Sequence, residues 1–252
     1  MENWVILSYF WVLFLFLGSF LNVWAFRTLS GTSVWNPPRS HCPSCGTQLQ
    51  ARDLVPFLSW VVLGGKCRTC KEPISWLYPL GELATAMLLT FVVRHGGGRW
   101  ETLVDVVLFL LLITVTLTDL RAKLIPNKIT LPGMVVVLVL RLFVHTDPIW
   151  VYLLGFAVGG GLLLLLALVP NGMGGGDVKL FALLGLGLGW KLVLLALFFS
   201  CVWGTAVGVP LKLSGKLRPR QAIPFGPFIL LGTLTSWAYG LQVWDWYRQL
   251  FL

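Results

Sequence analysis

Long apolar runs separated by short polar segments make up most of this sequence of 252 residues. A helix that crosses the hydrocarbon core of a bilayer needs about 20 mainly apolar residues. The runs predict eight transmembrane helices, at residues 4–26, 76–94, 102–120, 128–145, 149–169, 178–190, 191–213 and 223–244. The sixth run is short, and one continuous helix through 178–213 is the alternative to the sixth and seventh. The pattern therefore predicts an all-α polytopic membrane protein.

The composition supports this class of protein. Hydrophobic residues make up 57% of the chain and charged residues 12%, whereas soluble domains carry about 25% charged residues. The mean hydropathy is +0.82. The first apolar run lacks a basic segment before it and is too long for the core of a signal peptide. We therefore expect it to be retained as the first transmembrane helix.

The basic residues lie mainly on one side of the predicted spans. Fourteen of the 19 Lys and Arg residues fall in alternate loops, at 27–75, 121–128, 179 and 212–220. The positive-inside rule makes these loops cytoplasmic and both termini periplasmic. A single helix through 178–213 would put the basic loop 212–220 on the wrong side. The net charge of +9 thus indicates topology and contact with anionic lipid, and we expect no nucleic-acid partner.

The one long polar loop, residues 27–75, contains two C-x2-C motifs. Cys42 and Cys45 form the first pair, and Cys67 and Cys70 form the second. Two such pairs typically provide the four thiolates of a structural zinc site. Two disulfides or unligated thiols are the alternatives, but a cytoplasmic location disfavours disulfides. His41 could replace one ligand. The chain thus divides into a first helix (1–26), a zinc-binding loop (27–75) and a seven-helix core (76–252).

Two acidic residues end or begin predicted spans on the cytoplasmic side. Asp119 ends the third span, and Asp177 follows the sequence "PNGMGGG" at the start of the sixth. Charges are costly in lipid, so both residues are functional candidates. Asp105 lies about 21 Å of helix away from Asp119. We therefore expect Asp105 to be a hydrated residue near a helix start that takes no part in the same chemistry.

Two carboxyl groups that share a water molecule and one proton form the catalytic site of aspartic proteases. Gly174 and Gly176 would then let an extended substrate backbone approach the acid. Asp119 and Asp177 could instead form a proton relay in a transporter, or cap helix ends. A non-enzymatic assembly factor that docks through the zinc loop is a further alternative. The lone Cys201, inside an apolar run, is expected to be a small packing residue.

Several motifs in a fixed order carry a resemblance to a known family. They are "GSFLNVWAFR", "PPRSHCPSC", "LVPFLSW", "GGKCRTCKEPIS", "YPLGE", "TDLRAKLIPN", "GGGD" and "PFGPF". The chain resembles the type IV prepilin leader peptidases, which are membrane aspartic proteases of the G-x-G-D class. The resemblance implies that Asp119 and Asp177 are catalytic. The motif "IPFGPFI" could shape the start of the last helix or line a substrate groove.

The resemblance also implies a bacterial inner-membrane enzyme that cleaves on the cytoplasmic side. Its substrates would be prepilins, or the pilin-like subunits of secretion and competence machines, with a basic leader and an apolar N-terminal helix. Cleavage would follow a glycine, and S-adenosylmethionine would then methylate the new N-terminus. Leu77 and Gly81 differ from the family pattern near Glu82, which could assist methyl transfer or only cap the second helix and meet the basic loop. A peptidase without methyl transfer is the alternative.

Overall fold

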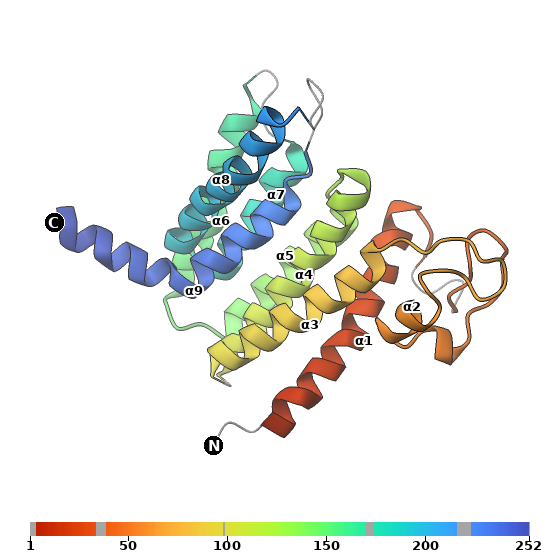
Figure 1. Ribbon diagram of the computed structural model, residues 1–252. Coiled ribbons are helices and arrows are strands. Elements are labelled where there is room, and N and C mark those ends of the chain that lie inside the picture. Colours follow the sequence, from red (N-terminus) through yellow and green to blue (C-terminus); the bar gives the residue numbers. More distant parts are fainter. Residues whose placement is uncertain (1–3, 34–38, 98, 170–173, 216–222, 252) are drawn as a thin grey trace. The chain divides into compact units, whose positions relative to one another are not determined.

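The computed structural model describes residues 4–33, 39–97, 99–169, 174–215 and 223–251. These residues form nine α-helices and one 3-10 turn, and they contain no strand (Figure 1). The helices are α1 (Trp4–Leu29), α2 (Leu58–Val62), α3 (Leu77–Gly96), α4 (Trp100–Ala122), α5 (Asn127–Phe143), α6 (Ile149–Ala167), α7 (Gly175–Leu188), α8 (Trp190–Leu213) and α9 (Gly226–Phe251), and the turn is η1 (Ala51–Asp53). Pro37 and Pro38 of the cysteine motif, and residues 216–220 of the basic loop, lie outside the described residues.

The predicted all-α class is confirmed for the described residues, and each of the eight predicted spans overlaps one of the longer helices. Five of these helices, α1, α3, α4, α6 and α8, are long and apolar enough to cross a membrane. The number of eight membrane crossings stays a prediction. Because α7 has only 14 residues, its length of about 21 Å is shorter than a typical hydrocarbon core of about 30 Å.

The apolar stretch 178–213 is two helices, as the charge pattern predicts. α7 ends at Leu188 and α8 begins at Trp190. Gly189, between them, has a φ of 81° and a ψ of 169°, a backbone conformation that residues with a side chain rarely adopt. This glycine therefore separates the two helices.

The chain divides into two compact units, Met1–Thr102 and Leu103–Leu252. In the first unit α1 packs along α3. A Cβ atom at Gly18 would lie only 2.9 Å from the Cα of Glu82, so glycine allows the two helices to approach closely. One turn further along α1, the buried Asn22 side chain donates a 2.9 Å hydrogen bond to the Tyr78 carbonyl oxygen. The polar loop 30–76 extends from this helix pair and contains η1 and α2.

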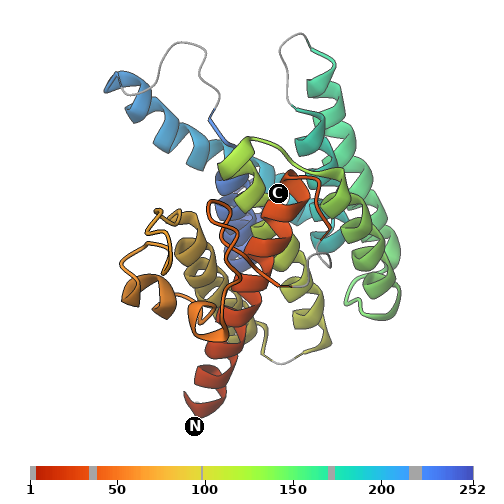
Figure 2. The same cartoon turned by 90° about the vertical axis from the view of Figure 1, so that its right-hand side faces the viewer.

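In the second unit α7 lies among α5, α6 and α8 (Figure 2). Its residues 180 to 188 are all buried. Gly155 of α6 and Gly185 of α7 contact each other so closely that a Cβ on either glycine would overlap the backbone of the other. Small residues permit this kind of backbone contact between membrane helices. Because α7 is enclosed by protein, its length does not have to match the bilayer.

α4 runs antiparallel to α7 in the same unit. A Cβ at Gly187, near the end of α7, would lie 2.8 Å from the Leu108 side chain, near the start of α4. The distances along the helices from this contact to Asp119 and to Asp177 are about 16 Å and 15 Å, at 1.5 Å per residue. The two acidic residues are therefore at similar depth, as their positions in the sequence predict.

A buried arginine holds the other end of α7. Arg141 of α5 is only 3% exposed, and its Nε donates a 3.0 Å hydrogen bond to the Gly187 carbonyl oxygen. Its Nη2 donates to the same oxygen, and the guanidinium lies 4.2 Å from the centre of the Tyr152 ring. A cation at a helix C-terminus satisfies terminal carbonyl groups and complements the helix dipole.

Candidate active site and metal centre

The four predicted cysteine ligands come together in the loop of the first unit. The Sγ atoms of Cys42, Cys45, Cys67 and Cys70 all lie within 4.8 Å of one another, and those of Cys42 and Cys70 are 3.8 Å apart. Sulfur atoms about 2.3 Å from a tetrahedral zinc ion would be about 3.8 Å apart. All four thiols are free. The cluster therefore fits a four-coordinate metal ion, and His41 is not part of it.

The two cysteine pairs have the same local backbone structure. The amide of Cys42 donates to the Thr47 carbonyl at 2.9 Å, and the amide of Cys67 donates to the Glu72 carbonyl at 2.9 Å. Each tight turn needs a positive φ one residue after its second cysteine, which Gly46 provides at 69° and Lys71 at 61°. Hydrogen bonds with Thr47 lower the pKa of the Cys45 thiol to about 6.

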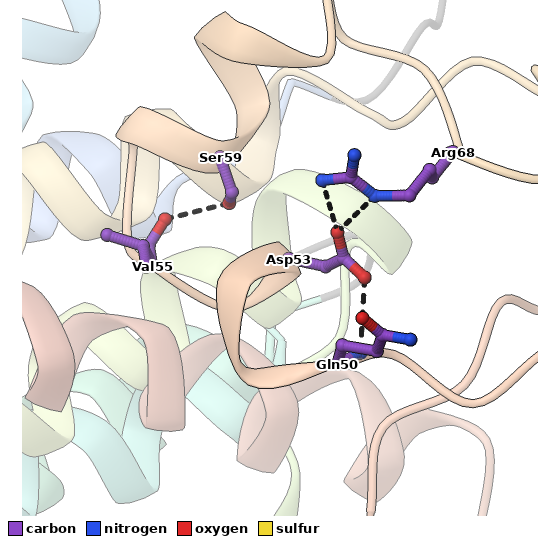
Figure 3. Close-up of polar contacts among 5 residues, drawn as sticks. All are labelled: Gln50, Asp53, Val55, Ser59 and Arg68. Atoms are coloured by element: carbon purple, nitrogen blue, oxygen red, sulfur yellow. Dashed lines mark hydrogen bonds and ion pairs between the residues drawn. The ribbon is translucent and has the colours of Figure 1, made fainter.

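An ion pair fixes the second cysteine pair to the rest of the loop (Figure 3). Arg68, between Cys67 and Cys70, donates from Nη2 and Nε to the Oδ1 of Asp53 at 2.8 Å. The other carboxylate oxygen accepts a 3.1 Å hydrogen bond from the Gln50 amide. The hydrogen bond from Arg68 is the main reason that the pKa of Asp53 lies below its usual value. Asp53 is thus an ionised anchor between η1 and the metal-binding turn.

Glu82 joins the loop to α3. Its buried carboxylate accepts a 2.7 Å hydrogen bond from the Phe57 amide, and the Ser19 side chain hydrogen-bonds the same carboxyl group. Phe57 precedes α2 and has a φ of 60°, a strained conformation for a residue with a side chain. Glu82 stabilises that conformation. Glu82 thus meets the loop 27–75, as one of its two interpretations predicts. It does not cap α3, because the N-cap residue is Trp76.

Asp119 lies in the last turn of α4 and is 6% exposed. Its Oδ2 accepts a 2.6 Å hydrogen bond from the amide of Gly226, the first residue of α9. The carbonyl of Gly226 lies 3.4 Å from the Thr116 hydroxyl, one turn before Asp119. The motif "PFGPF" therefore starts α9, as one of its two interpretations predicts, and it also holds a candidate catalytic side chain.

Asp177 lies in the first turn of α7 and is partly exposed. Its amide donates a 3.0 Å hydrogen bond to the carbonyl of Gly174, the N-cap residue. Gly176 has a structural role, because a Cβ there would lie 2.7 Å from the Cβ of Ile125 in the α4–α5 connection. Gly174 and Gly175 are exposed, and among the described residues a Cβ on Gly174 would approach only Asp177. Backbone next to the acid is therefore open at these two glycines.

Asp119 and Asp177 lie in the second unit, at the end of α4 and the start of α7, close enough for the charge of Asp119 to act on the Asp177 carboxyl group. The predicted hydration of Asp105 is wrong, because it is only 9% exposed and lies one turn inside α4. Cys201 is not a buried packing residue either, since it lies on an exposed face of α8. The sequence does not predict Gly226 as a partner of Asp119, although Gly226 belongs to the motif "IPFGPFI" described above.

Comparison with known proteins gives matches along most of the chain. Residues 12–95 match the family described as bacterial peptidase A24 N-terminal domain, and residues 106–209 match the type IV leader peptidase family. The prepilin leader peptidase/N-methyltransferase of Bacillus subtilis (strain 168) is 37% identical over 247 residues, which cover 98% of this chain and 99% of that protein.

The protein of the same description from Aeromonas hydrophila is 34% identical over 276 residues, covering 97% of this chain and 95% of its own. No solved structure gives a significant match. The first family match ends at residue 95 and the second begins at residue 106, so the boundary between the compact units, after Thr102, lies between them.

Proposed function

This chain belongs to the type IV leader peptidase family, and we propose that it is a membrane aspartic endopeptidase that removes the leader peptides of prepilins or pilin-like subunits. The observation that carries the proposal is the proximity of Asp119 and Asp177, at the end of α4 and the start of α7. The names of the relatives support cleavage followed by N-methylation of the new N-terminus.

In this mechanism Asp119 and Asp177 hold one proton and one water molecule between them. The ionised carboxylate takes a proton from the water, and the protonated carboxyl group donates a hydrogen bond to the carbonyl oxygen of the scissile bond. Which residue carries the proton is a property of the pair. The hydrogen bond from the Gly226 amide orients the Asp119 carboxyl group.

The substrate backbone approaches Asp177 at the exposed Gly174, in our proposal. Gly176 acts in a different way, because its missing side chain lets the start of α7 pack against Ile125. Both glycines of the G-x-G-D motif are then required, one for substrate access and the other for the position of the acid.

The cysteine cluster holds zinc in our proposal. Four thiolates complete a tetrahedral sphere, and no coordination position remains for water. The ion is therefore structural and stabilises a loop that has little core of its own. His41 is not needed as a ligand.

S-adenosylmethionine would supply the methyl group in the second reaction. We assign no residue of this chain to that transfer, because the carboxylate of Glu82 accepts the Phe57 amide and also bonds Ser19. Glu82 is in our proposal an anchor of the loop, and any effect of its substitution on methylation would be indirect. A peptidase without methyl transfer remains the alternative.

The charge distribution supports a bacterial inner-membrane location with eight crossings, both termini in the periplasm and the two acids on the cytoplasmic side. A substrate with a basic leader would lie against anionic lipid on that side, and nucleic acid would not be a partner. We retain the functional division into a first helix (1–26), a zinc loop (27–75) and a peptidase core (76–252).

The test compares the wild type with Asp119→Asn and Asp177→Asn in purified membranes. The substrate is a prepilin with a basic leader and a glycine before its apolar helix, and products are identified by mass in the presence of S-adenosylmethionine. We expect cleavage by the wild type and by Asp147→Asn, a control at an exposed acid between α5 and α6. We expect none by the two active-site variants, and one added methyl group on the product if methylation occurs.

Equal cleavage by all four proteins would refute the aspartate pair. Uncleaved substrate in every reaction would refute the peptidase and make the proton-relay transporter the next hypothesis. The metal is tested separately by elemental analysis. One zinc per chain, lost in a Cys42→Ser/Cys67→Ser variant, is the expected result, and reduced wild-type protein without metal would refute the zinc site.

A further inference from the structure

An apolar groove opens between α8 and the start of α9 in the second unit. It has a volume of about 350 Å³. The α8 side is formed mainly by small residues, and the α9 side by larger apolar side chains. The residues that matter here are Cys201, Gly204 and Gly208 on α8, and Ile223, Phe225 and Phe228 opposite them.

The small residues of the groove form a helix-packing motif. Gly204 and Gly208 are the two glycines of "GTAVG", a G-x-x-x-G sequence inside an apolar helix. Such a motif permits the close approach of a second membrane helix. A Cβ at Gly204 would lie 3.3 Å from the Phe225 ring, and one at Gly208 would lie 3.8 Å from the Ile223 side chain. Among the described residues these are only side-chain contacts, so no described helix backbone lies against the motif there as Gly185 lies against Gly155.

One wall residue of the groove directly precedes a residue of the candidate active site in the sequence. Phe225 forms part of its wall, and the next residue, Gly226, donates the 2.6 Å hydrogen bond to Asp119. A segment of substrate bound in the groove would therefore lie next to the scissile peptide bond, which is held at Asp119 and Asp177. A lipid chain or a second copy of this protein could contact an apolar groove, but neither would explain why a wall residue of the groove directly precedes the residue that bonds Asp119.

We propose that this groove binds the apolar helix of the substrate, in the turns that follow the cleaved bond. The inference rests on the proposed function. In it, the G-x-x-x-G face of α8 recognises an apolar α-helix, which lies in the groove. Phe225 and Phe228, whose ring centres are 6.2 Å apart, provide aromatic surface for apolar substrate side chains. α8 and α9 thus hold the mature part of the substrate, and its leader lies beyond Asp119.

The first test uses Cys201 as a natural probe of the groove. Single cysteines are placed along the first three turns of the apolar helix of a prepilin, and each is mixed with the Asp119→Asn protein under mild oxidation. We expect a disulfide with Cys201 only from positions three or four residues apart, on one face of the substrate helix. Cys201→Ser is the control for linkage to the zinc-binding cysteines.

The second test fills the groove with Gly208→Leu. This position is chosen because a Cβ there meets only Ile223, at an ordinary distance, so the variant should fold and leave Asp119 undisturbed. We expect KM for the prepilin to rise about tenfold and kcat to change little. Gly161→Leu on α6, where a Cβ meets nothing within 4 Å, should keep both constants.

The outcomes separate this inference from the proposed function. A wild type that does not cleave prepilin refutes the peptidase itself. A wild type that cleaves, with an unchanged KM in Gly208→Leu and no cross-link from any substrate position, refutes the groove as the substrate site. Disulfide-linked dimers through Cys201 without substrate would instead identify the groove as a contact between two copies of this chain.

Discussion

Gly226 is the position where a single methyl group should disturb catalysis most directly. Its amide bonds the Asp119 carboxylate, and a Cβ added to it would lie 2.9 Å from the Oδ2, 3.0 Å from the Cβ and 3.3 Å from the Cγ of Asp119. Non-bonded heavy atoms prefer separations of about 3.5–4.0 Å. In Gly226→Ala, Asp119 or the start of α9 must therefore move by about 0.5–1 Å.

The size of the effect follows from this displacement. A shift of about 1 Å in a catalytic group can cost about a hundredfold in rate. We therefore expect the single-turnover rate of prepilin cleavage to fall about 10-fold to 100-fold in Gly226→Ala. The φ of Gly226 is not positive, so alanine brings no backbone strain there and the predicted loss is steric.

The assay is single-turnover cleavage of a prepilin by purified protein, with product measured by mass. Gly161→Ala is the matched control, because a Cβ at Gly161 meets no atom within 4 Å. Metal content and elution volume show whether each variant keeps its fold. A Gly226→Ala protein that cleaves within twofold of the wild-type rate would refute the idea that the start of α9 positions Asp119.

Three further predictions concern stability and metal binding. Gly155→Ala should lower the free energy of unfolding by about 1–3 kcal/mol, because its Cβ overlaps the backbone of α7. Gly161→Ala, on the same helix, should be neutral or stabilising by up to about 1 kcal/mol. Equal melting temperatures of the Gly155→Ala and Gly161→Ala proteins in detergent would contradict the close packing of Gly155 against α7. Arg141→Leu should cost about 1–3 kcal/mol in the same assay, since it leaves a buried carbonyl without its donor; an unchanged melting temperature would refute the cap. Asp53→Asn and Arg68→Gln should each weaken zinc affinity. A double-mutant cycle should give a coupling of about 0.2–1 kcal/mol, and strict additivity would show that the ion pair does not support the metal site.

Local patterns carried most of what the sequence could predict. Apolar runs locate the helices because a segment that crosses lipid needs apolar side chains and must satisfy its backbone hydrogen bonds within itself, as a helix does. The cysteine cluster follows from spacing, since two residues between cysteines bring both sulfurs to one ion. The meeting of Asp119 and Asp177 follows from the alternating direction of successive helices, which places the end of one and the start of another at the same depth.

Contacts set by tertiary packing could not be read from the sequence. Gly226 and Asp119 are 107 residues apart, and nothing in either local sequence specifies that α9 begins beside the end of α4. The burial of Asp105 likewise depends on neighbouring helices rather than on its position near a helix start. The role of Glu82 required the strained loop residue Phe57, whose partner is 25 residues further along the chain.

The short length of α7 has a consequence for how a membrane substrate is cleaved. α7 is about 9 Å shorter than the hydrocarbon core, and Arg141 holds its C-terminal end by hydrogen bonds to Gly187. A helix fixed at that end and enclosed by α5, α6 and α8 cannot extend Asp177 far beyond the lipid. In the proposed topology, α7 with its C-terminal end at the periplasmic boundary would leave Asp177 up to about 9 Å inside the cytoplasmic boundary of the hydrocarbon core. The proposed cleavage just ahead of the substrate's apolar helix would then take place within the membrane, so that helix would not have to leave the bilayer to reach the two acids.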